Sequence, residues 1–239
     1  MSALLKQKVS FILTRDDADQ VNRLVIFDCD GTLVNTIDDV CACFNEALSI
    51  SGLPTRDPHD IAKYVGLPLE KIVEGIIPSA SVAAGMVPVV SSEYRAAYAK
   101  SEKRNTRLFP GMGELVGWLK RQGIKVAVNS NKPEENLRSL VKALLAHESI
   151  SIAGYVPGRA VKPSGEGAKY LMAQCGASPE HTLYIGDTWV DAETAKDTGV
   201  DCAIVTWGQG TSALYGATEQ ALLCETPFQL KEVIRSKLM

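Results

Sequence analysis

The chain has few of the residues from which several common kinds of site are built. Its three histidines, at positions 59, 147 and 181, lie far apart, so no pair has metal-ligand spacing and we expect no zinc site. Its six cysteines include no Cys-x-x-Cys pair, and several stand in apolar stretches. Small buried thiols are the expected outcome, and a reducing, cytoplasmic setting fits this pattern best.

Long apolar runs and an excess of basic residues are also missing. No apolar stretch approaches the roughly 20 residues that span a bilayer, and Phe11–Leu13 is too short for a signal-peptide core. The net charge is −3, so no broad basic face is available for nucleic acid or an anionic membrane. We therefore expect neither nucleic acid nor a membrane as a partner.

The chain does have the composition of a globular protein and a repeated strand–helix pattern. Its 239 residues are 46% hydrophobic and 22% charged, which suits a substantial core. Short apolar strands are predicted at Leu24–Phe27, Lys125–Val128, Ile150–Val156, Thr182–Ile185 and Cys202–Thr206. Amphipathic helices are predicted between them, and a last one near Phe228–Lys237. This alternation predicts an α/β fold with a parallel sheet and right-handed crossovers.

Two stretches fall outside that pattern. Residues 1–22 have mixed charge and weak periodicity and are taken as an N-terminal extension, either a helix or a loose arm. After a helix that begins behind a capping Thr36 and ends near Gly52, residues up to about 107 contain only helix-like segments broken by Gly and Pro, at 58–65, 69–77 and 89–104. We therefore divide the chain into a core of residues 1–36 and 108–239 and an inserted helical unit of residues 37–107.

The first predicted strand runs directly into Asp28-Cys29-Asp30-Gly31. In open parallel sheets, ligands bind just beyond the carboxyl ends of the strands, so both carboxylates stand where a site is expected. Two acids at the end of an apolar strand are costly unless a cation neutralises them. Taken alone, the motif is equally consistent with a turn, because Asp and Gly both favour turns.

Further polar residues follow the other strands in order: Ser130, Lys162, Asp187 and Asp191. Taken singly, Lys162 is more typical of a solvated surface lysine, Ser130 of a turn, and the two acids of a helix start supported by its dipole. Together they would line one edge of the sheet. Four carboxylates in one place call for a hard cation such as Mg²⁺, and a metal, an ammonium and a hydroxyl suit a phosphoryl group.

This set of residues indicates phosphoryl transfer. Asp28 is then a nucleophile that forms an aspartyl-phosphate, which divides the reaction into two easier steps. Asp30 serves as general acid toward the leaving alcohol and later as general base toward water.

On these motifs the sequence resembles the haloacid dehalogenase-like hydrolase superfamily, over roughly residues 22–225. The motifs are Asp28-Cys29-Asp30-Gly31-Thr32, Ser130-Asn131-Lys132-Pro133, Lys162-Pro163-Ser164 and Gly186-Asp187 with Asp191. The helical insertion resembles the cap of the phosphoglycolate-phosphatase and β-phosphoglucomutase branch, and Leu108-Phe109-Pro110-Gly111 looks most like phosphoglycolate phosphatases.

The resemblance implies a Rossmann-like three-layer core with an α-helical cap, and it assigns roles to residues. Asp28 is the nucleophile and a Mg²⁺ ligand, and Asp30 is the acid/base whose backbone carbonyl also binds the metal. Asp187 is the third protein ligand, and Asp191 orients or supplements the metal shell. Phosphate binding is assigned to Thr32, Ser130, Asn131 and Lys162. Asp30 also argues against dehalogenation, because dehalogenases of the superfamily lack this acid.

The sequence departs from the pattern of the relatives at three places. Asn35 stands where many have aspartate, and Ser130 replaces the commoner threonine, but neither change removes a required functional group. The segment 157–161 is short and lacks the Asp-rich loop that many relatives carry there, which affects the surroundings of Lys162.

The cap would close on hinges near Asn35–Ile37 and Leu108–Pro110, excluding water. The segment Gly66–Leu69 either faces the site, as in relatives, or is a plain turn. One of the cap's basic residues reaching inward would favour an acidic substrate; they are Arg56, Lys63, Lys71, Arg95, Lys100, Lys103, Arg104 and Arg107.

We therefore expect a cytoplasmic, Mg²⁺-dependent phosphatase for a small phosphorylated metabolite such as phosphoglycolate, as a monomer or homodimer. The alternatives are a phosphomutase of the same branch, a pyrophosphatase and a non-catalytic phosphate-binding regulatory domain.

Overall fold

A computed structural model describes residues 21–146, 149–210 and 221–239. Its main sheet has six strands in the order β5-β4-β1-β6-β7-β8, and every neighbouring pair is parallel. The strands are β1 (Leu24–Phe27), β4 (Lys125–Pro133), β5 (Ser151–Tyr155), β6 (Thr182–Gly186), β7 (Asp201–Val205) and β8 (Leu222–Cys224). The α/β, Rossmann-like fold expected from the sequence is confirmed, and β1 lies at the centre of the sheet.

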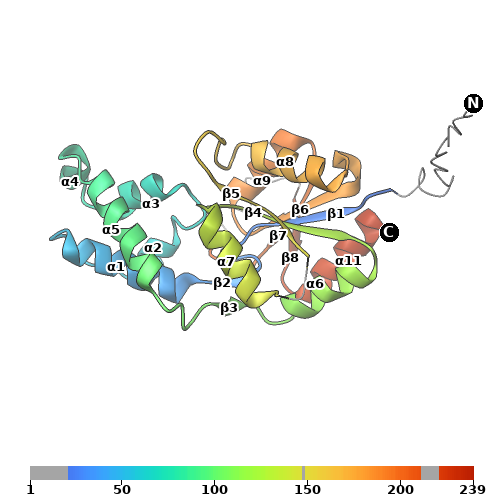
Figure 1. Ribbon diagram of the computed structural model, residues 1–239, viewed down its shortest axis with the longest axis horizontal. Coiled ribbons are helices and arrows are strands. Elements are labelled where there is room, and N and C mark those ends of the chain that lie inside the picture. The colour runs from blue at the N-terminus through green and yellow to red at the C-terminus, as the bar shows by residue number, and fades with distance from the viewer. Residues whose placement is uncertain (1–20, 147–148, 211–220) are drawn as a thin grey trace, which may run out of the picture.

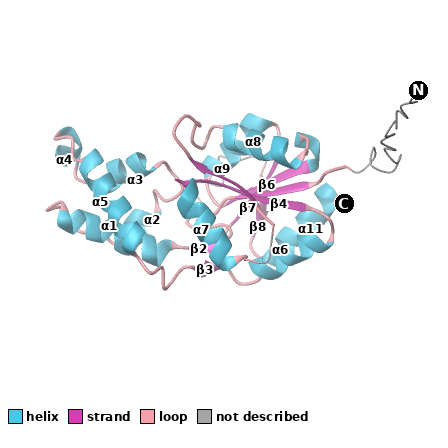
Figure 2. Ribbon diagram, viewed as in Figure 1, coloured by secondary structure: helices cyan, strands magenta, loops and turns pink. Residues whose placement is uncertain are grey.

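Helices cover both faces of the sheet (Figures 1 and 2). The helices α6 (Met112–Arg121), α7 (Glu134–Leu144) and α11 (Pro227–Leu238) lie on one side, and α8 (Glu166–Cys175) and α9 (Trp189–Thr198) on the other. A short 3-10 helix, η2 (Pro179–His181), precedes β6.

The side-chain alternation of β1 explains this three-layer arrangement. Val25 and Phe27 pack into the hydrophobic cluster of α6, α7 and α11, whereas Leu24 and Ile26 pack into the cluster of α8 and α9. Successive residues of a strand point to opposite faces, and a strand buried on both faces reads as a continuous apolar run. The four apolar residues before Asp28 are therefore what a central strand of such a sheet requires.

The segment between β1 and α6 folds as a separate group of helices beyond the carboxyl end of β1 (Figure 1). These helices are α1 (Ile37–Ile50), α2 (Pro58–Ala62), α3 (Leu69–Ile76), α4 (Ser79–Ala83) and α5 (Val87–Lys100). They share a hydrophobic cluster of their own, in which the ring of Phe44 stacks on that of Tyr94 with centroids 3.9 Å apart.

Both chain connections to this helical group run through a two-stranded antiparallel ribbon. Its strands β2 (Val34–Asn35) and β3 (Arg107–Leu108) pair Val34 with Leu108 and Asn35 with Arg107. The ribbon overlaps the two predicted hinges at Asn35 and Leu108 and ties them to each other.

Several sequence predictions of local structure were wrong. The hydroxyl of Thr36 does not cap α1 but donates a hydrogen bond to the buried carboxylate of Asp30, at 2.5 Å from Oδ1, because Thr36 has a helical backbone conformation instead of the extended one usual for a capping residue. The predicted helix 89–104 begins at Val87 and ends at Lys100. Strands β2, β3 and β8 and helix α4 had not been predicted, and β4 extends to Pro133 instead of ending before Asn129.

Most of the predicted N-terminal extension, residues 1–20, lies outside the described residues. Within the described parts of the chain, no helix is long and apolar enough to cross a membrane. All six cysteines lie in those parts, and all are free thiols.

Candidate active site

Asp28 stands at the carboxyl end of β1, and the sheet itself fixes its place. Its backbone N–H donates to the carbonyl of Ile185 in the neighbouring strand β6 at 2.7 Å, and the residue is only 3% exposed. The chain then turns through Gly31, which has φ +92°, a backbone conformation that side chains rarely allow. A Cβ at Gly31 would collide with the carboxylate of Asp187 and the side chain of Gln209.

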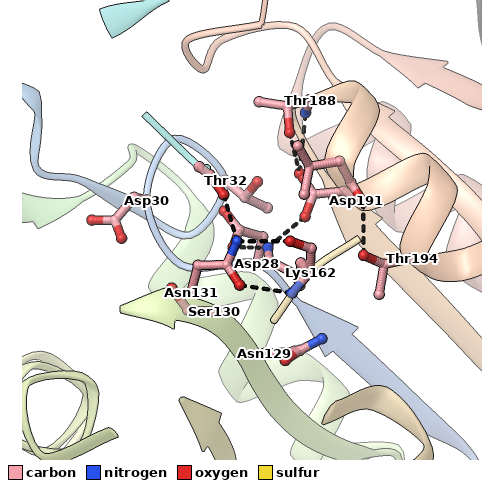
Figure 3. A network of polar contacts seen from close by, with 12 residues as sticks. Asp28, Asp30, Thr32, Asn129, Ser130, Asn131, Lys162, Thr188, Asp191 and Thr194 are labelled. Atoms are coloured by element: carbon pink, nitrogen blue, oxygen red, sulfur yellow. Dashed lines mark hydrogen bonds and ion pairs between the residues drawn. The ribbon is translucent and has the colours of Figure 1, made fainter. Parts of the chain in front are cut away.

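The ammonium of Lys162 binds two of the predicted acids (Figure 3). Its Nζ lies 2.5 Å from Asp28 Oδ1 and 2.7 Å from Asp191 Oδ1, and all three side chains are almost completely buried. Burial alone would lower the pKa of Lys162, but the two carboxylates raise it well above its ordinary value, so the group stays charged. Lys162 is therefore a buried lysine, although most lysines in proteins are solvated.

The two acids that follow β6 are held by different donors. Asp191 Oδ2 accepts hydrogen bonds from the backbone N–H of Thr188 at 3.1 Å and from its hydroxyl at 2.9 Å, at the start of α9. Asp187 accepts from the hydroxyl of Thr32 at 3.0 Å and from the backbone N–H of Gln209 at 2.7 Å. One oxygen of Asp191 thus supports the start of α9, as expected for an acid at a helix start, while its other oxygen binds Lys162.

Carboxylate oxygens of Asp28, Asp187 and Asp191 lie within 4.8 Å of one another in a buried position. Burial raises the pKa of Asp28 well above its usual range, against the opposing effect of Lys162, and burial together with Asp191 raises that of Asp187 to about 7. One ammonium does not balance three buried carboxylates. Hard oxygen ligands in this number suit a divalent cation, and this acidic cluster could hold one.

The carboxylate of Asp30 does not join the acidic cluster. It accepts from Thr36 and forms an ion pair with the ammonium of Lys132 at 3.1 Å, and in Figure 3 it points away from Lys162. The two carboxylates of the first motif therefore face different partners. This separation is consistent with the two roles expected from the sequence, nucleophile for Asp28 and general acid/base for Asp30.

The predicted phosphate-binding residues occupy three kinds of position. Ser130 lines the cavity beside Asp28, and its hydroxyl accepts from the backbone N–H of Lys132 at 3.1 Å. The Thr32 hydroxyl supports Asp187. The amide of Asn131 clasps the backbone of Lys162, accepting from its N–H at 2.8 Å and donating to its carbonyl at 3.2 Å, and it also donates to the carbonyl of Gly66 at 2.9 Å. Direct phosphate contacts of these side chains stay a prediction.

Sequence reasoning missed Lys132 and the aromatic side chains around it. The Lys132 ammonium lies 4.7 Å from the centre of the Tyr98 ring and is 7% exposed as a side chain. The sequence did contain a signal for Lys132. It stands two residues after Ser130 in an extended strand, and residues i and i+2 of a strand share a face, so both side chains are expected on the side of the site.

A cavity of about 640 Å³, counting the solvent at its mouth, opens between the sheet edge and the helical group. It is lined by Asp28, Asp30, Val40, Val65, Gly66, Leu67, Leu69, Ile72, Tyr94, Arg95, Tyr98, Ser130, Asn131, Lys132, Pro133 and Asn136. The segment Gly66–Leu69 therefore contributes to the site and is not merely a turn. Of the eight basic residues singled out between Arg56 and Arg107, Arg95 is the one that lines this cavity.

The fold and site define a class: a Rossmann-like hydrolase with an aspartate at the end of its central strand and a helical insertion above it. Residues 25–205 match the family model described as haloacid dehalogenase-like hydrolase. The chain belongs to this family.

Similar proteins carry phosphatase names. The chain is 30% identical to phosphoglycolate phosphatase 1 of Pseudomonas aeruginosa over 80% of its own length and 72% of that protein. It is 31% identical to the Dickeya dadantii protein named Probable phosphatase IndB, over 85% and 89% of the two chains. Its fold matches the crystal structure of a provisionally named phosphoglycolate phosphatase of Lactobacillus delbrueckii subsp. bulgaricus with a TM-score of 0.82, at 26% identity and covering 90% and 98% of the chains. Family, relatives and fold together support a phosphoric monoester hydrolase.

Proposed function

We propose that the protein is a Mg²⁺-dependent phosphatase that hydrolyses a small phosphate monoester through an aspartyl-phosphate on Asp28. The observation that carries the proposal is the position of Asp28. It is buried at the end of the central strand, it contacts Lys162, and it lines the open cavity. A carboxylate at this place can attack phosphorus while an ammonium offsets charge on the transferring group.

In the first step, an oxygen of Asp28 forms a bond to phosphorus as the bond from phosphorus to the bridging oxygen breaks. Asp30 lines the same cavity, and in the protonated form that the second step regenerates it gives its proton to the leaving oxygen, so an alcohol departs. In the second step, Asp30 takes a proton from water as that water attacks phosphorus, and the bond to Asp28 breaks. Thr36 and Lys132 hold the Asp30 carboxylate in place for both transfers.

Mg²⁺ would be held by Asp28, the backbone carbonyl of Asp30, Asp187 and Asp191, and it would neutralise charge on the phosphoryl oxygens. The cluster fits such an ion because its acids are buried with too little positive charge. Glycines pack against it, because a Cβ at Gly31 or Gly208 would strike the Asp187 carboxylate. We assign phosphate binding to Lys162 and Ser130, with Thr32 and Asn131 supporting Asp187 and Lys162.

Residues 37–107 would act as a cap on the core of residues 1–36 and 108–239. The ribbon β2–β3 is the connection between them, and Gly66 of this segment already hydrogen-bonds to Asn131 of the core. Closure over the cavity would exclude water during the first step.

The names of the relatives favour a phosphoglycolate-like substrate. The free cysteines are consistent with a cytoplasmic protein, which would act as a monomer or homodimer.

The test is a panel of small phosphate esters assayed with Mg²⁺, on wild type and on Asp28→Asn. We expect Asp28→Asn to lower kcat by about a thousandfold or more, because the amide cannot form the phosphoenzyme. Chelation by EDTA should abolish wild-type turnover, and added Mg²⁺ should restore it. The exposed Asp38, in the first turn of α1, provides the matched control Asp38→Asn, which should retain turnover.

Turnover by Asp28→Asn at the rate of the control variant would contradict the nucleophile assignment. Transfer of phosphate to a sugar phosphate instead of release as inorganic phosphate would indicate a phosphomutase, and a preference for pyrophosphate a pyrophosphatase. No turnover on the whole panel together with tight phosphate binding would indicate a regulatory domain.

A further inference from the structure

The feature that the mechanism does not explain fully is the buried ammonium of Lys132. It comes from the last part of β4, pairs with Asp30 at 3.1 Å and lies over the Tyr98 ring of α5. Burial disfavours the charged form, but Asp30 raises the pKa of Lys132 well above its ordinary value, so the charge is retained. An ammonium has three donors, of which the contacts with Asp30 and with the Tyr98 hydroxyl use two.

The hydroxyl of Tyr98 is a second unexplained group at the same place. Its oxygen is buried and lies beside the Lys132 ammonium, the Tyr98 side chain lines the cavity wall, and within the described residues the hydroxyl donates to no acceptor. Burial raises the pKa of Tyr98 although the Lys132 ammonium opposes this, so the hydroxyl stays a neutral donor. A buried hydroxyl whose hydrogen has no acceptor costs about 1–3 kcal/mol, which a ligand or a water that accepts from it would recover.

In the proposed reaction, these two donors would lie on the side of the leaving group. Asp30 must approach the bridging oxygen to protonate it, and Lys132 is in direct contact with Asp30. The part of the substrate attached to that oxygen therefore extends toward Lys132 and Tyr98. Much of the neighbouring cap wall is apolar, built from Val40, Leu67, Leu69 and Ile72, and the ammonium and the tyrosine hydroxyl are polar groups close to Asp30.

We propose that Lys132 and Tyr98 bind a carboxylate on the leaving group and thereby make the enzyme selective for phosphate esters of small hydroxy acids. This inference rests on the proposed phosphatase function. A carboxylate has two oxygens, so it can accept from the ammonium and from the hydroxyl at once. The site is preformed, because Tyr98 packs against Tyr94, with ring centroids 5.8 Å apart, and Tyr94 stacks on Phe44.

Arg95 is the other cation of the cavity wall, and the structure favours Lys132 over it. The Arg95 side chain is 50% exposed, and its guanidinium already binds Glu70 at 2.7 Å on the surface of the cap. Exposed charges are weakened by solvent and salt, whereas the Lys132 ammonium acts from a buried position.

The experiment compares two esters of nearly equal size, phosphoglycolate and 2-hydroxyethyl phosphate, in which a hydroxymethyl group replaces the carboxylate. We expect wild type to prefer phosphoglycolate, and Lys132→Met to lower the ratio of the two kcat/KM values by about 30-fold, the size expected for a lost charged hydrogen bond. Tyr98→Phe should lower the same ratio by about fivefold. Tyr98→Phe removes only one oxygen and keeps the ring. It therefore tests the proposal even if Lys132→Met folds poorly.

Two variants serve as controls. Lys71→Met removes the same charge from an exposed cap lysine, which pairs with Glu74, and should leave the ratio as in wild type. Arg95→Met removes the competing cation, and a change of ratio there but not in Lys132→Met would overturn the assignment.

Equal losses on both esters in Lys132→Met and an unchanged ratio in Tyr98→Phe would mean that Lys132 serves Asp30 alone, and the inference would fail. A wild-type enzyme without preference between the esters would refute it as well. Failure of the phosphatase proposal is read from other results: turnover by Asp28→Asn as fast as wild type, or no hydrolysis of either ester by wild type.

Discussion

At the scale of single residues, Gly31 shows how closely the first motif is built around the acids. Its φ of +92° permits the turn after Asp30, and the absence of a side chain leaves room for Asp187 and Gln209. Gly52 adopts a similar φ of +70° at the end of α1, but a Cβ there would meet nothing within 4 Å. Comparing substitutions at the two glycines therefore distinguishes the effect of backbone strain alone from that of a steric clash at the site.

We therefore predict different outcomes for Gly31→Ala and Gly52→Ala. Gly52→Ala should cost about 1 kcal/mol of unfolding free energy from its backbone conformation and should leave kcat unchanged. Gly31→Ala should cost more than this and lower kcat/KM by at least about a hundredfold, because it displaces Asp187. Urea unfolding and phosphate release measure both. Equal activity of the two variants would show that the Asp187 position is not critical.

At the scale of elements, the sequence predicts long and strongly patterned segments well. Helix α6 was predicted with its observed bounds, and α9 ends at a glycine in the left-handed conformation, as the pattern indicated. Strands β2 and β3 have two residues each, too few for any period, and their pairing joins positions 34 and 108. Such a pairing is decided by the three-dimensional fold, so local pattern cannot reveal it.

The start of α1 is tied to the returning connection through Asp39. This buried carboxylate accepts hydrogen bonds from the backbone N–H of Asn105 at 3.0 Å, from its side-chain amide at 3.1 Å and from the hydroxyl of Thr106 at 2.7 Å. Burial opposes ionisation, but these donors lower the pKa of Asp39 below its ordinary value of 3.8. The ionised form is thus more favourable in the folded protein than in the unfolded chain.

We predict that Asp39→Ala lowers the free energy of unfolding by about 2 kcal/mol at pH 7, the range for hydrogen bonds to a charged group. Because the folded pKa is depressed, this contribution is present above the unfolded pKa and is lost as the pH falls through the folded pKa. The difference between wild type and Asp39→Ala should therefore shrink below about pH 4. Urea midpoints at pH 7 and pH 3 measure it, with the exposed neighbour Asp38→Ala as control; a difference independent of pH would contradict the role of the charge.

At the scale of the whole molecule, residues that are far apart in the sequence meet at one edge of the sheet. The sequence predicted the meeting of Asp28, Lys162, Asp187 and Asp191 because each follows a strand of a parallel sheet. It did not predict the contact of Lys132 with Tyr98, because that contact joins the core to a helix of the insertion. How the core and the insertion approach each other depends on the packing between them, and the sequence pattern of either part alone does not reveal that packing.

The same convergence has a thermodynamic consequence for the intact protein. A cation held by Asp28, Asp187 and Asp191 binds the folded state only, since these residues are brought together by folding. We predict that Mg²⁺ at about 100 times its dissociation constant adds about 2.7 kcal/mol to the stability, which raises the melting temperature by about 5–10 °C for a chain of this size. EDTA should reverse the increase. Asp187→Asn should lose it, because the cluster then lacks one of its anionic ligands, whereas Asp38→Asn should keep it in full. A melting temperature that responds to Mg²⁺ equally in Asp187→Asn and in wild type would show that the ion binds elsewhere on the protein.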